Sequence, residues 1–483
     1  MSIYDKYETV IGLEIHVQLL TKSKAYAADS TDFGSMPNTQ VSAITLGHPG
    51  TLPMLNEKVI EYAVKLGLAC KCNIRYENQF ARKNYFYADL PKGYQITQDK
   101  TPICNGGYVT IKGKDGKPKN IELTRIHMEE DAGKSIHDQD PFDSLIDLNR
   151  AGVPLLEVVS EPVIRSGEDA YQYLTEMRKI VRYLEICDGN MEEGSMRCDA
   201  NISVRLHGEK AFGKRVEVKN MNSVRNVQRA IEYESKRLVD IIEAGGTVDQ
   251  ETRSFDATNG TTFTLRSKEA ANDYRYFPEP DLSPVFVTEE YIAKIKADMP
   301  ALPAELFKKY IEHLGLSEYD ADVLTSTKEV ALFFEEIIKH TTNYKAASNW
   351  IMGGVKSYIN ERAIHIKDFP ISPIRIAELI NFVDTGKVSS TIASQQLFPA
   401  MMQEKNLTPE QIAIKNNWII ESNTDSLHEY VKQAIAKFPE KVSEYKSGKK
   451  GLLGLFMGEV MKLSGGKADP KLTSKMLGEE LEK

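Results

Sequence analysis

The sequence contains little of what defines several protein classes. There are 5 cysteines in 483 residues, without a Cys-x-x-Cys pair, so we expect no disulfide framework and a reducing compartment. No apolar run is long enough to span a bilayer. Residues 1–8 lack the basic and apolar regions of a signal peptide. We therefore expect a cytoplasmic protein that makes no use of a membrane.

An excess of basic charge is also absent. The formal net charge is -8, so the surface as a whole does not favour nucleic acid, and any such contact must be local. The apolar and charged fractions, 41% and 27%, are those of an ordinary globular protein. The length predicts about three domains.

A phosphate-binding loop is missing as well. Gly133-Lys134-Ser135 resembles the end of a Walker A motif, but Met128 stands five residues before Gly133, where that loop requires glycine. The sequence therefore excludes nucleotide binding of the Walker type at this segment.

Residues 10–19 form the most informative stretch. With a period of two, one face carries Ile11, Leu13, Ile15, Val17 and Leu19, and the other carries Gly12, Glu14, His16 and Gln18. This alternation predicts a strand with one buried face. Glu14 and His16 are two residues apart and can share one cation. The alternative is an exposed strand face that binds nothing.

The rest of the chain predicts an α+β fold. Alternating strands and helices up to residue 293 indicate an antiparallel sheet with helices on one side, lined by polar groups. Pro300 and Pro303 mark a break, and we expect an all-α helical domain over 294–406. Thr408, Pro409 and Gln411 form a capping-box pattern that opens a small helical tail domain over 407–483.

Further acids lie on predicted strands, namely Glu129, Glu130, Glu157, Asp199 and Glu217. Glu157 stands inside an apolar run, and a carboxylate buried there needs a partner. Repelling carboxylates on one sheet face are stable when cations neutralise them. Oxygen ligands with one imidazole favour Mg²⁺ or Mn²⁺ over zinc. The residues alone thus indicate an enzyme that handles a metal and phosphate.

Two basic segments are candidate phosphate contacts. Residues 80–95 interleave aromatic side chains with Lys83 and Lys92, which suits phosphate or stacked bases; the alternative is an aromatic strand beside solvated lysines. Lys446, Lys449 and Lys450 form a basic turn in the tail, where phosphate contact competes with a plain solvated surface.

Several long motifs resemble a known family. They include VIGLEIHVQL (10–19), LGHPGTLP (46–53), RKNYFYADLPKGYQI (82–96), RIHMEEDAGKS (125–135), DLNRAGVPLLEVVSEP (147–162), MEEGSMRCDANIS (191–203) and VEVKNMNS (216–223). The chain resembles the B subunits of the tRNA-dependent amidotransferases over its whole length, tail included.

The resemblance implies a cradle-shaped kinase domain that uses ATP and Mg²⁺. It would phosphorylate the side-chain carboxylate of Glu-tRNA(Gln) or Asp-tRNA(Asn), and ammonia would then displace the phosphate to give Gln-tRNA(Gln) or Asn-tRNA(Asn). The implied partners are an amidase subunit that supplies ammonia from glutamine and a small clamp subunit, in a heterotrimer. The tail would bind tRNA(Gln) or tRNA(Asn).

The resemblance also implies site residues. The implied metal ligands are His16, Glu130 and Glu157, with Glu14 and Glu217 close by. Strand pleating instead favours Glu129 over Glu130, so both remain candidates. Lys83, Lys92, Arg150 and Lys219 are candidates for neutralising phosphate.

One departure from the family concerns zinc. Many family members carry a four-cysteine zinc site near the N-terminus, and the matching segments here, 26–29 and 41–45, contain no cysteine. We therefore predict no zinc, because such sites use thiolates. The loop from Ser23 to Thr45 must then hold itself by packing.

Overall fold

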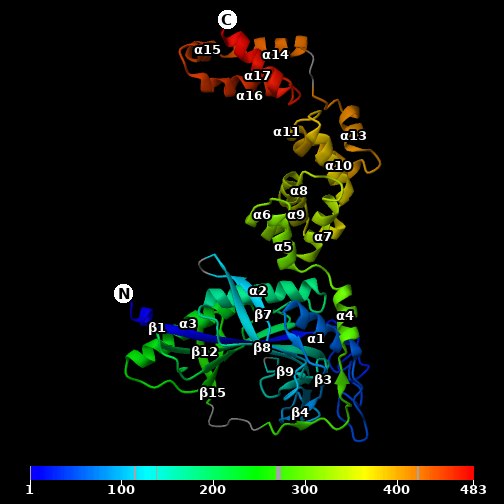
Figure 1. The fold of residues 1–483 in the computed structure, drawn as a ribbon, viewed down its shortest axis with the longest axis vertical. Coiled ribbons are helices and arrows are strands. Elements are labelled where there is room, and N and C mark those ends of the chain that lie inside the picture. The colour runs from blue at the N-terminus through cyan, green and yellow to red at the C-terminus, as the bar shows by residue number, and fades with distance from the viewer. Residues whose placement is uncertain (1, 114–115, 138, 268–273, 421–423, 483) are drawn as a thin grey trace. The chain divides into compact units, whose positions relative to one another are not determined.

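The computed structural model describes residues 2–113, 116–137, 139–267, 274–420 and 424–482 (Figure 1). The chain divides into two compact units, Met1–Leu302 and Pro303–Lys483. No helix within the described ranges combines the length and the apolar character needed to cross a bilayer.

The first unit is built on a 10-stranded sheet with β1 (Tyr7–Gln18) at its centre. On one side of β1 follow β12 (Met196–Leu206), β13 (Val216–Lys219), β14 (Glu251–Asp256) and β15 (Thr261–Ser267). On the other side follow β11 (Pro154–Ser160), β8 (Pro118–Glu130), β6 (Cys104–Asn105) and β2 (Asn73–Ile74), and β7 (Tyr108–Lys112) also pairs with β8.

The expectation of a wholly antiparallel sheet is wrong at one pair. β13 and β14 run parallel, while the other pairs described for this sheet are antiparallel. The reason is the connection: α3 (Val224–Glu243) carries the chain from the end of β13 back to the start of β14, as a parallel crossover requires. The fold is therefore mixed α/β with a mixed sheet, followed by an all-helical C-terminal unit.

The two faces of β1 have different surroundings. Ile11, Leu13, Ile15 and Val17 are fully buried in a core shared with α1 (Glu57–Ala69), α2 (Gly167–Tyr183) and α3. Burying each such side chain contributes about 1.5–3 kcal/mol. Because side chains alternate along a strand, Glu14 and His16 must lie on the face away from these helices.

Close contact between α2 and α3 depends on a glycine. A Cβ at Gly167, the first residue of α2, would lie 2.9 Å from the backbone oxygen of Gln228 on α3. Serine caps both helices: Ser166 Oγ accepts a hydrogen bond from the Asp169 N–H, and Ser223 Oγ accepts one from the Asn226 N–H.

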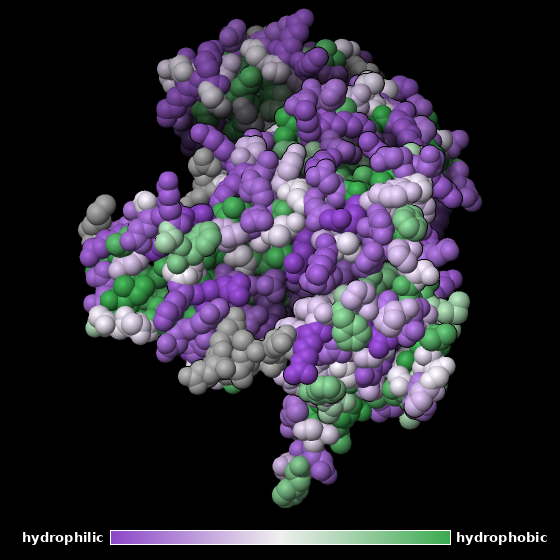
Figure 2. Space-filling model, turned by 60° about the horizontal axis from the view of Figure 1, so that its bottom comes forward, coloured by the Kyte–Doolittle hydropathy of each residue, from purple (hydrophilic) through white to green (hydrophobic). Residues whose placement is uncertain are grey.

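The first unit also contains three small sheets. They comprise β4 (Ala81–Asn84), β5 (Tyr94–Thr97) and β16 (Phe277–Pro278); β9 (Lys134–Ile136) and β10 (Leu145–Asp147); and β3 (Glu77–Asn78) and β17 (Val285–Phe286). In Figure 1, β4 and β9 lie on the opposite side of the main sheet from α2. Seen from that side, the first unit has a hollow with a mainly hydrophilic lining (Figure 2).

The first unit ends after α4 (Glu289–Asp298). Ile295 of α4 and Leu302 belong to its core, so the predicted boundary at residue 293 falls inside this helix. The second unit contains α5 (Pro303–Glu312), α6 (Glu318–Leu324), α7 (Lys328–Ile337), α8 (Tyr344–Trp350), α9 (Lys356–Arg362), α10 (Pro373–Asp384), α11 (Ser390–Ile392), α12 (Phe398–Gln403) and α13 (Pro409–Lys415).

The last helices of the second unit have a core of their own. These are α14 (Thr424–Lys437), α15 (Pro439–Lys446), α16 (Leu453–Leu463) and α17 (Pro470–Glu482), which pack around Phe456. The expected helix start is confirmed: Thr408 and Gln411 form a reciprocal capping box with Pro409 at the first position of α13.

Hydrogen bonds stabilise the loop from residue 23 to residue 45. Ser42 Oγ donates to Asp29 Oδ2 at 2.8 Å, and Thr45 Oγ1 donates to the same oxygen. The buried amine of Lys24 donates to the Gln40 carbonyl at 2.7 Å. Residues of the two cysteine-free segments are thus joined through Asp29.

We predict that Asp29→Ala loosens this loop, because Ser42 and Thr45 lose their shared acceptor. A hydrogen bond to a charged group contributes about 1.5–3 kcal/mol. Hydrogen exchange should therefore become faster by about tenfold or more in residues 23–45. Asp32→Ala removes an exposed acid of the same loop and serves as the control; equal exchange in the two variants would contradict the role of Asp29.

Candidate functional site

Strand register places one imidazole–carboxylate row across the sheet. His16 of β1 lies opposite Glu157 of β11, and Glu157 lies opposite His127 of β8. Nε2 of His16 lies 3.5 Å from Glu157 Oε2, and Nε2 of His127 lies 3.4 Å from the same oxygen. The buried carboxylate therefore has an imidazole partner on each side.

Glu129 completes a first acid group with His16 and Glu157. One ligand atom from each of these residues lies within 4.8 Å of the others. Glu129 is 2% exposed, and its Oε2 accepts no hydrogen bond among the described residues. A buried, unsatisfied carboxylate oxygen beside a second carboxylate and an imidazole fits a divalent cation of the Mg²⁺ or Mn²⁺ type.

Glu14, two residues before His16 on β1, forms a second acid group with Asp199 and Glu217. One ligand atom from each of these residues lies within 4.8 Å of the others. Glu14 is opposite Asp199 in the register of β1 and β12. The ammonium of Lys219 forms ion pairs with Asp199 and, at 3.1 Å, with Glu217. Asn201 Nδ2 donates to Glu14 at 2.9 Å. A cationic group already lies among these three carboxylates.

The expected single cluster around Glu14 and His16 is therefore two groups. Antiparallel pairing gives each residue of β1 its own cross-strand partner, so Glu14 faces Asp199 while His16 faces Glu157. Glu14 and His16 are neighbours on one face of β1, yet they belong to different acid groups.

The structure places Glu130 outside both groups. Lys92 forms an ion pair with Glu130 Oε1, and the Ile96 N–H donates to the same oxygen at 2.8 Å. Pleating directs Glu129 and Glu130 to opposite sides of β8. Of the two candidates, Glu129 is the one that lies with His16 and Glu157.

The pKa values of Glu14, Glu129 and Glu157 are shifted in different directions. Burial and the nearby carboxylates of Glu157 and Asp199 raise the pKa of Glu14. Burial also raises the pKa of Glu129, against the effect of Lys83. For Glu157, the two imidazoles outweigh burial and lower its pKa well below the usual value. Glu157 is thus the carboxylate that its surroundings keep ionised.

The four candidate phosphate-binding cations are spread over the site. Lys83 Nζ lies 3.5 Å from Glu129 Oε1 and 5.2 Å from the Tyr274 ring centroid, and Lys219 lies in the second acid group. Lys92 pairs with Glu130. Arg150 instead donates to the backbone oxygens of Ala132 and Gly133 and lies 3.7 Å from Asp131.

Sequence reasoning missed His127 and the ion pair between Asp131 and Arg197. Arg197 Nη2 donates to Asp131 Oδ2 at 2.7 Å, and Gln18 Nε2 donates to the same oxygen at 2.5 Å. Despite burial, Arg197 and Arg150 lower the pKa of Asp131. The alternation Arg125, His127, Glu129 along β8 was the available signal for His127.

Two models of known protein families match most of this chain. The family model described as the GatB/GatE catalytic domain matches residues 9–293, and the one described as the GatB domain matches residues 332–481. The chain belongs to the GatB family.

Curated relatives align with almost the whole length of this GatB chain. The B subunit of the aspartyl/glutamyl-tRNA(Asn/Gln) amidotransferase from Caldicellulosiruptor bescii is 48% identical over 481 residues, covering 99% of this chain and 100% of the relative. The protein of that name from Chlorobium phaeobacteroides is 48% identical over 476 residues, covering 99% of each chain. The resemblance inferred from the motifs is confirmed.

In the GatB tail, the three candidate lysines lie at the junction of α15 and α16. Lys449 forms an ion pair with Glu444 at 3.0 Å, and Lys450 forms one with Glu482 at 3.1 Å; all three lysines are exposed. Solvent screens such exposed pairs strongly, so these ammonium groups can exchange their partners for phosphates at little cost.

The separate positions of Glu129 and Glu130 lead to a prediction. Glu129→Gln should weaken Mn²⁺ binding by about tenfold or more, because a charged oxygen ligand is lost. Glu130→Gln should leave Mn²⁺ affinity nearly unchanged, since its partners are Lys92 and Ile96. Titration followed by electron paramagnetic resonance measures both, and the reverse order of effects would make Glu130 the ligand.

Proposed function

We propose that this chain is the kinase and transamidase component of a tRNA-dependent amidotransferase. It would phosphorylate the side-chain carboxylate of Glu-tRNA(Gln), Asp-tRNA(Asn) or both, in an ATP- and Mg²⁺-dependent step in the cytoplasm. The observation that carries the proposal is the pair of acid groups on one face of the sheet, each with a lysine in contact.

The chemistry explains why such a site is needed. A carboxylate is a poor electrophile, so its oxygen first attacks the γ-phosphorus of ATP and ADP leaves. Ammonia then attacks the carbonyl carbon of the acyl phosphate, and inorganic phosphate leaves. Divalent cations held by His16, Glu129 and Glu157, and by Glu14, Asp199 and Glu217, would supply charge neutralisation for the phosphates.

The residues of this chain have further roles in the proposal. Lys83 and Lys219 lie within 3.5 Å of the acid groups and would neutralise phosphate oxygens as the charge moves from ATP to the acyl group. Tyr85 and Tyr274 lie edge to face, 6.0 Å apart, next to Lys83 and would stack on a base. Exclusion of water from the hollow would limit hydrolysis of the acyl phosphate.

The proposal requires partners. Ammonia at the acyl carbon would come from glutamine hydrolysed by an amidase subunit, in a heterotrimer with a small clamp subunit. The names of the relatives, which specify one subunit of an amidotransferase and both tRNAs, support such an assembly. The exposed Lys446, Lys449 and Lys450 support tRNA binding by the tail.

The proposal predicts loss of tRNA-stimulated ATP hydrolysis in His16→Ala and Glu157→Gln. Each variant removes one member of the first acid group, and we expect a decrease of at least about a hundredfold with the fold intact, because charge at the phosphates is left unneutralised. ADP release is measured with and without Glu-tRNA(Gln) and Asp-tRNA(Asn), in the complex with the amidase. Glu161→Gln, four residues from Glu157 and outside both acid groups, is the control.

The outcomes separate the alternatives. Normal stimulated turnover in both variants would contradict the site assignment. Phosphate release that needs no nucleotide would indicate a metal-dependent hydrolase. Binding of misacylated tRNA by the unmodified protein without ATP consumption would indicate a scaffold that has lost the chemistry.

A further inference from the structure

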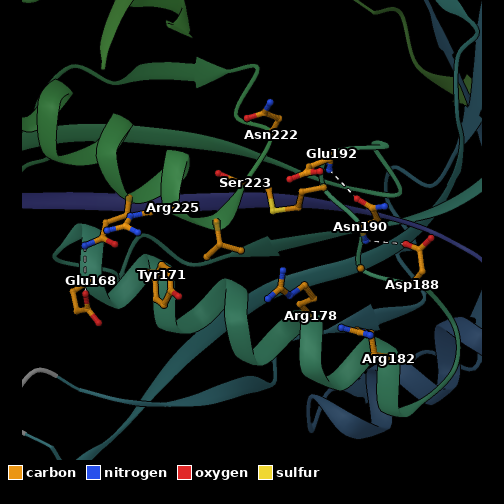
Figure 3. A pocket seen from close by; sticks show the side chains of 14 residues that line it. Glu168, Tyr171, Arg178, Arg182, Asp188, Asn190, Glu192, Asn222, Ser223 and Arg225 are labelled. Carbon is orange, nitrogen blue, oxygen red and sulfur yellow. Dashed lines mark hydrogen bonds between the residues drawn. The ribbon is translucent and has the colours of Figure 1, made fainter. Parts of the chain in front are cut away.

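A cleft opens beside α2 and the start of α3, and none of the residues that line it belongs to either acid group (Figure 3). It has a volume of about 740 Å³ and lies between α2, the start of α3 and the loop that leads into β12. Three arginines line it: Arg178 and Arg182 on α2, and Arg225 on α3. No step of the proposed reaction uses these residues.

Among the described residues, no side chain or backbone group is a hydrogen-bond or ion-pair partner of these three guanidinium groups. Arg178 is half-buried, Arg182 and Arg225 are exposed, and none of their side chains forms a hydrogen bond or ion pair within the described part of the chain. Arg178 and Arg182 are four residues apart and therefore lie on the same side of α2, as Figure 3 shows. Free, adjacent guanidinium groups are donors that match phosphate oxygens.

Three acids line the cleft, and two of them, Glu168 and Asp188, accept hydrogen bonds from neighbouring groups, while Glu192 is exposed. Glu168 Oε1 accepts a hydrogen bond from Gln172 at 2.9 Å, and its Oε2 accepts one from Gln228 at 3.3 Å. Asp188 accepts hydrogen bonds from the Asn190 N–H at 2.8 Å and from Ser195 Oγ at 3.2 Å. Glu168 and Asp188 are therefore held by their own hydrogen bonds and form no ion pair with the three arginines, which remain available to an anion.

A glycine supports the arginine stems. Gly189 has a φ of +68°, and a Cβ there would lie 2.5 Å from Cγ of Arg178 and 3.5 Å from Cδ of Arg182. The loop thus lies directly against both aliphatic stems. This contact limits how far the two side chains can swing and orients their charged ends.

The position of the cleft relates it to the proposed active site. β13 carries Glu217 and Lys219 on the acid face, and Asn222, which lines the cleft, follows Lys219 by three residues. Three residues span at most about 11 Å. The cleft therefore lies at the end of the sheet around which a ligand can reach the acid face.

We infer that this arginine cleft binds the phosphodiester backbone of the RNA substrate, holding a helical stem while its end reaches the acid groups. The inference rests on the proposed function. Amide, hydroxyl and guanidinium groups dominate the lining, whereas a pocket for a free nucleotide is mostly apolar and enclosed. The net charge of -8 also requires phosphate contacts to be concentrated at such local sites.

The test is binding of a tRNA(Gln) transcript to the full chain, without ATP, over a series of salt concentrations. Arg178→Gln, Arg182→Gln and Arg225→Gln are combined in one variant. We expect affinity to fall by about tenfold or more and the slope of log K against log salt to decrease by about two to three units, one per lost phosphate contact.

A matched control removes the same charge elsewhere. Lys210→Gln, Lys236→Gln and Lys296→Gln together delete three exposed cations of the same unit that do not line the cleft. Gly189→Ala keeps every charge but displaces the arginine stems, and it should weaken binding while circular dichroism remains unchanged. Equal losses in the cleft and control triples would overturn the inference, because only net charge would then matter.

Other outcomes identify other ligands. Unchanged tRNA affinity in the cleft variant, together with lost binding of tripolyphosphate, would overturn the inference in favour of a free anion. Unchanged tRNA affinity with lost association of the amidase would overturn it in favour of a protein partner. If the unmodified chain does not bind tRNA, the proposed function itself fails, which is a result distinct from these.

Discussion

The structure depends on keeping five carboxylates close together on one face of a sheet. Glu14, Glu129, Glu157, Asp199 and Glu217 come from five strands, and their mutual repulsion in a partly buried setting opposes folding. Two kinds of group offset it: imidazoles on both sides of Glu157, and the ammonium groups of Lys83 beside Glu129 and Lys219 beside Asp199. The arrangement stays incomplete, because Glu129 keeps a buried oxygen without a hydrogen bond among the described residues.

The same strands that hold the acids also form the core. Alternate residues of β1 pack against α2 and α3, and this packing fixes the register that brings His16 opposite Glu157. A slip of one residue would bury the acids and expose the apolar set. The rigid positions of the acids therefore follow from hydrophobic packing on the other face.

Some of this was predictable from sequence and some was not. Alternation in residues 10–19 predicted both faces of β1, and the lone Glu157 in an apolar run predicted a partnered carboxylate. Pleating favoured Glu129 for the same reason that the structure separates it from Glu130. The division of Glu14 and His16 into two groups depends on cross-strand register, which no local pattern encodes. The parallel pair β13 and β14 likewise depends on where α3 returns the chain.

The central claim is that the two acid groups bind divalent cations together with a nucleotide. Crystals soaked with Mn²⁺ and a non-hydrolysable ATP analogue test it directly through the anomalous signal of manganese. The account predicts a peak among His16, Glu129 and Glu157 and a second among Glu14, Asp199 and Glu217, with the phosphates of the analogue between them. Bound analogue with its manganese away from both groups, or no manganese at either group, would contradict it.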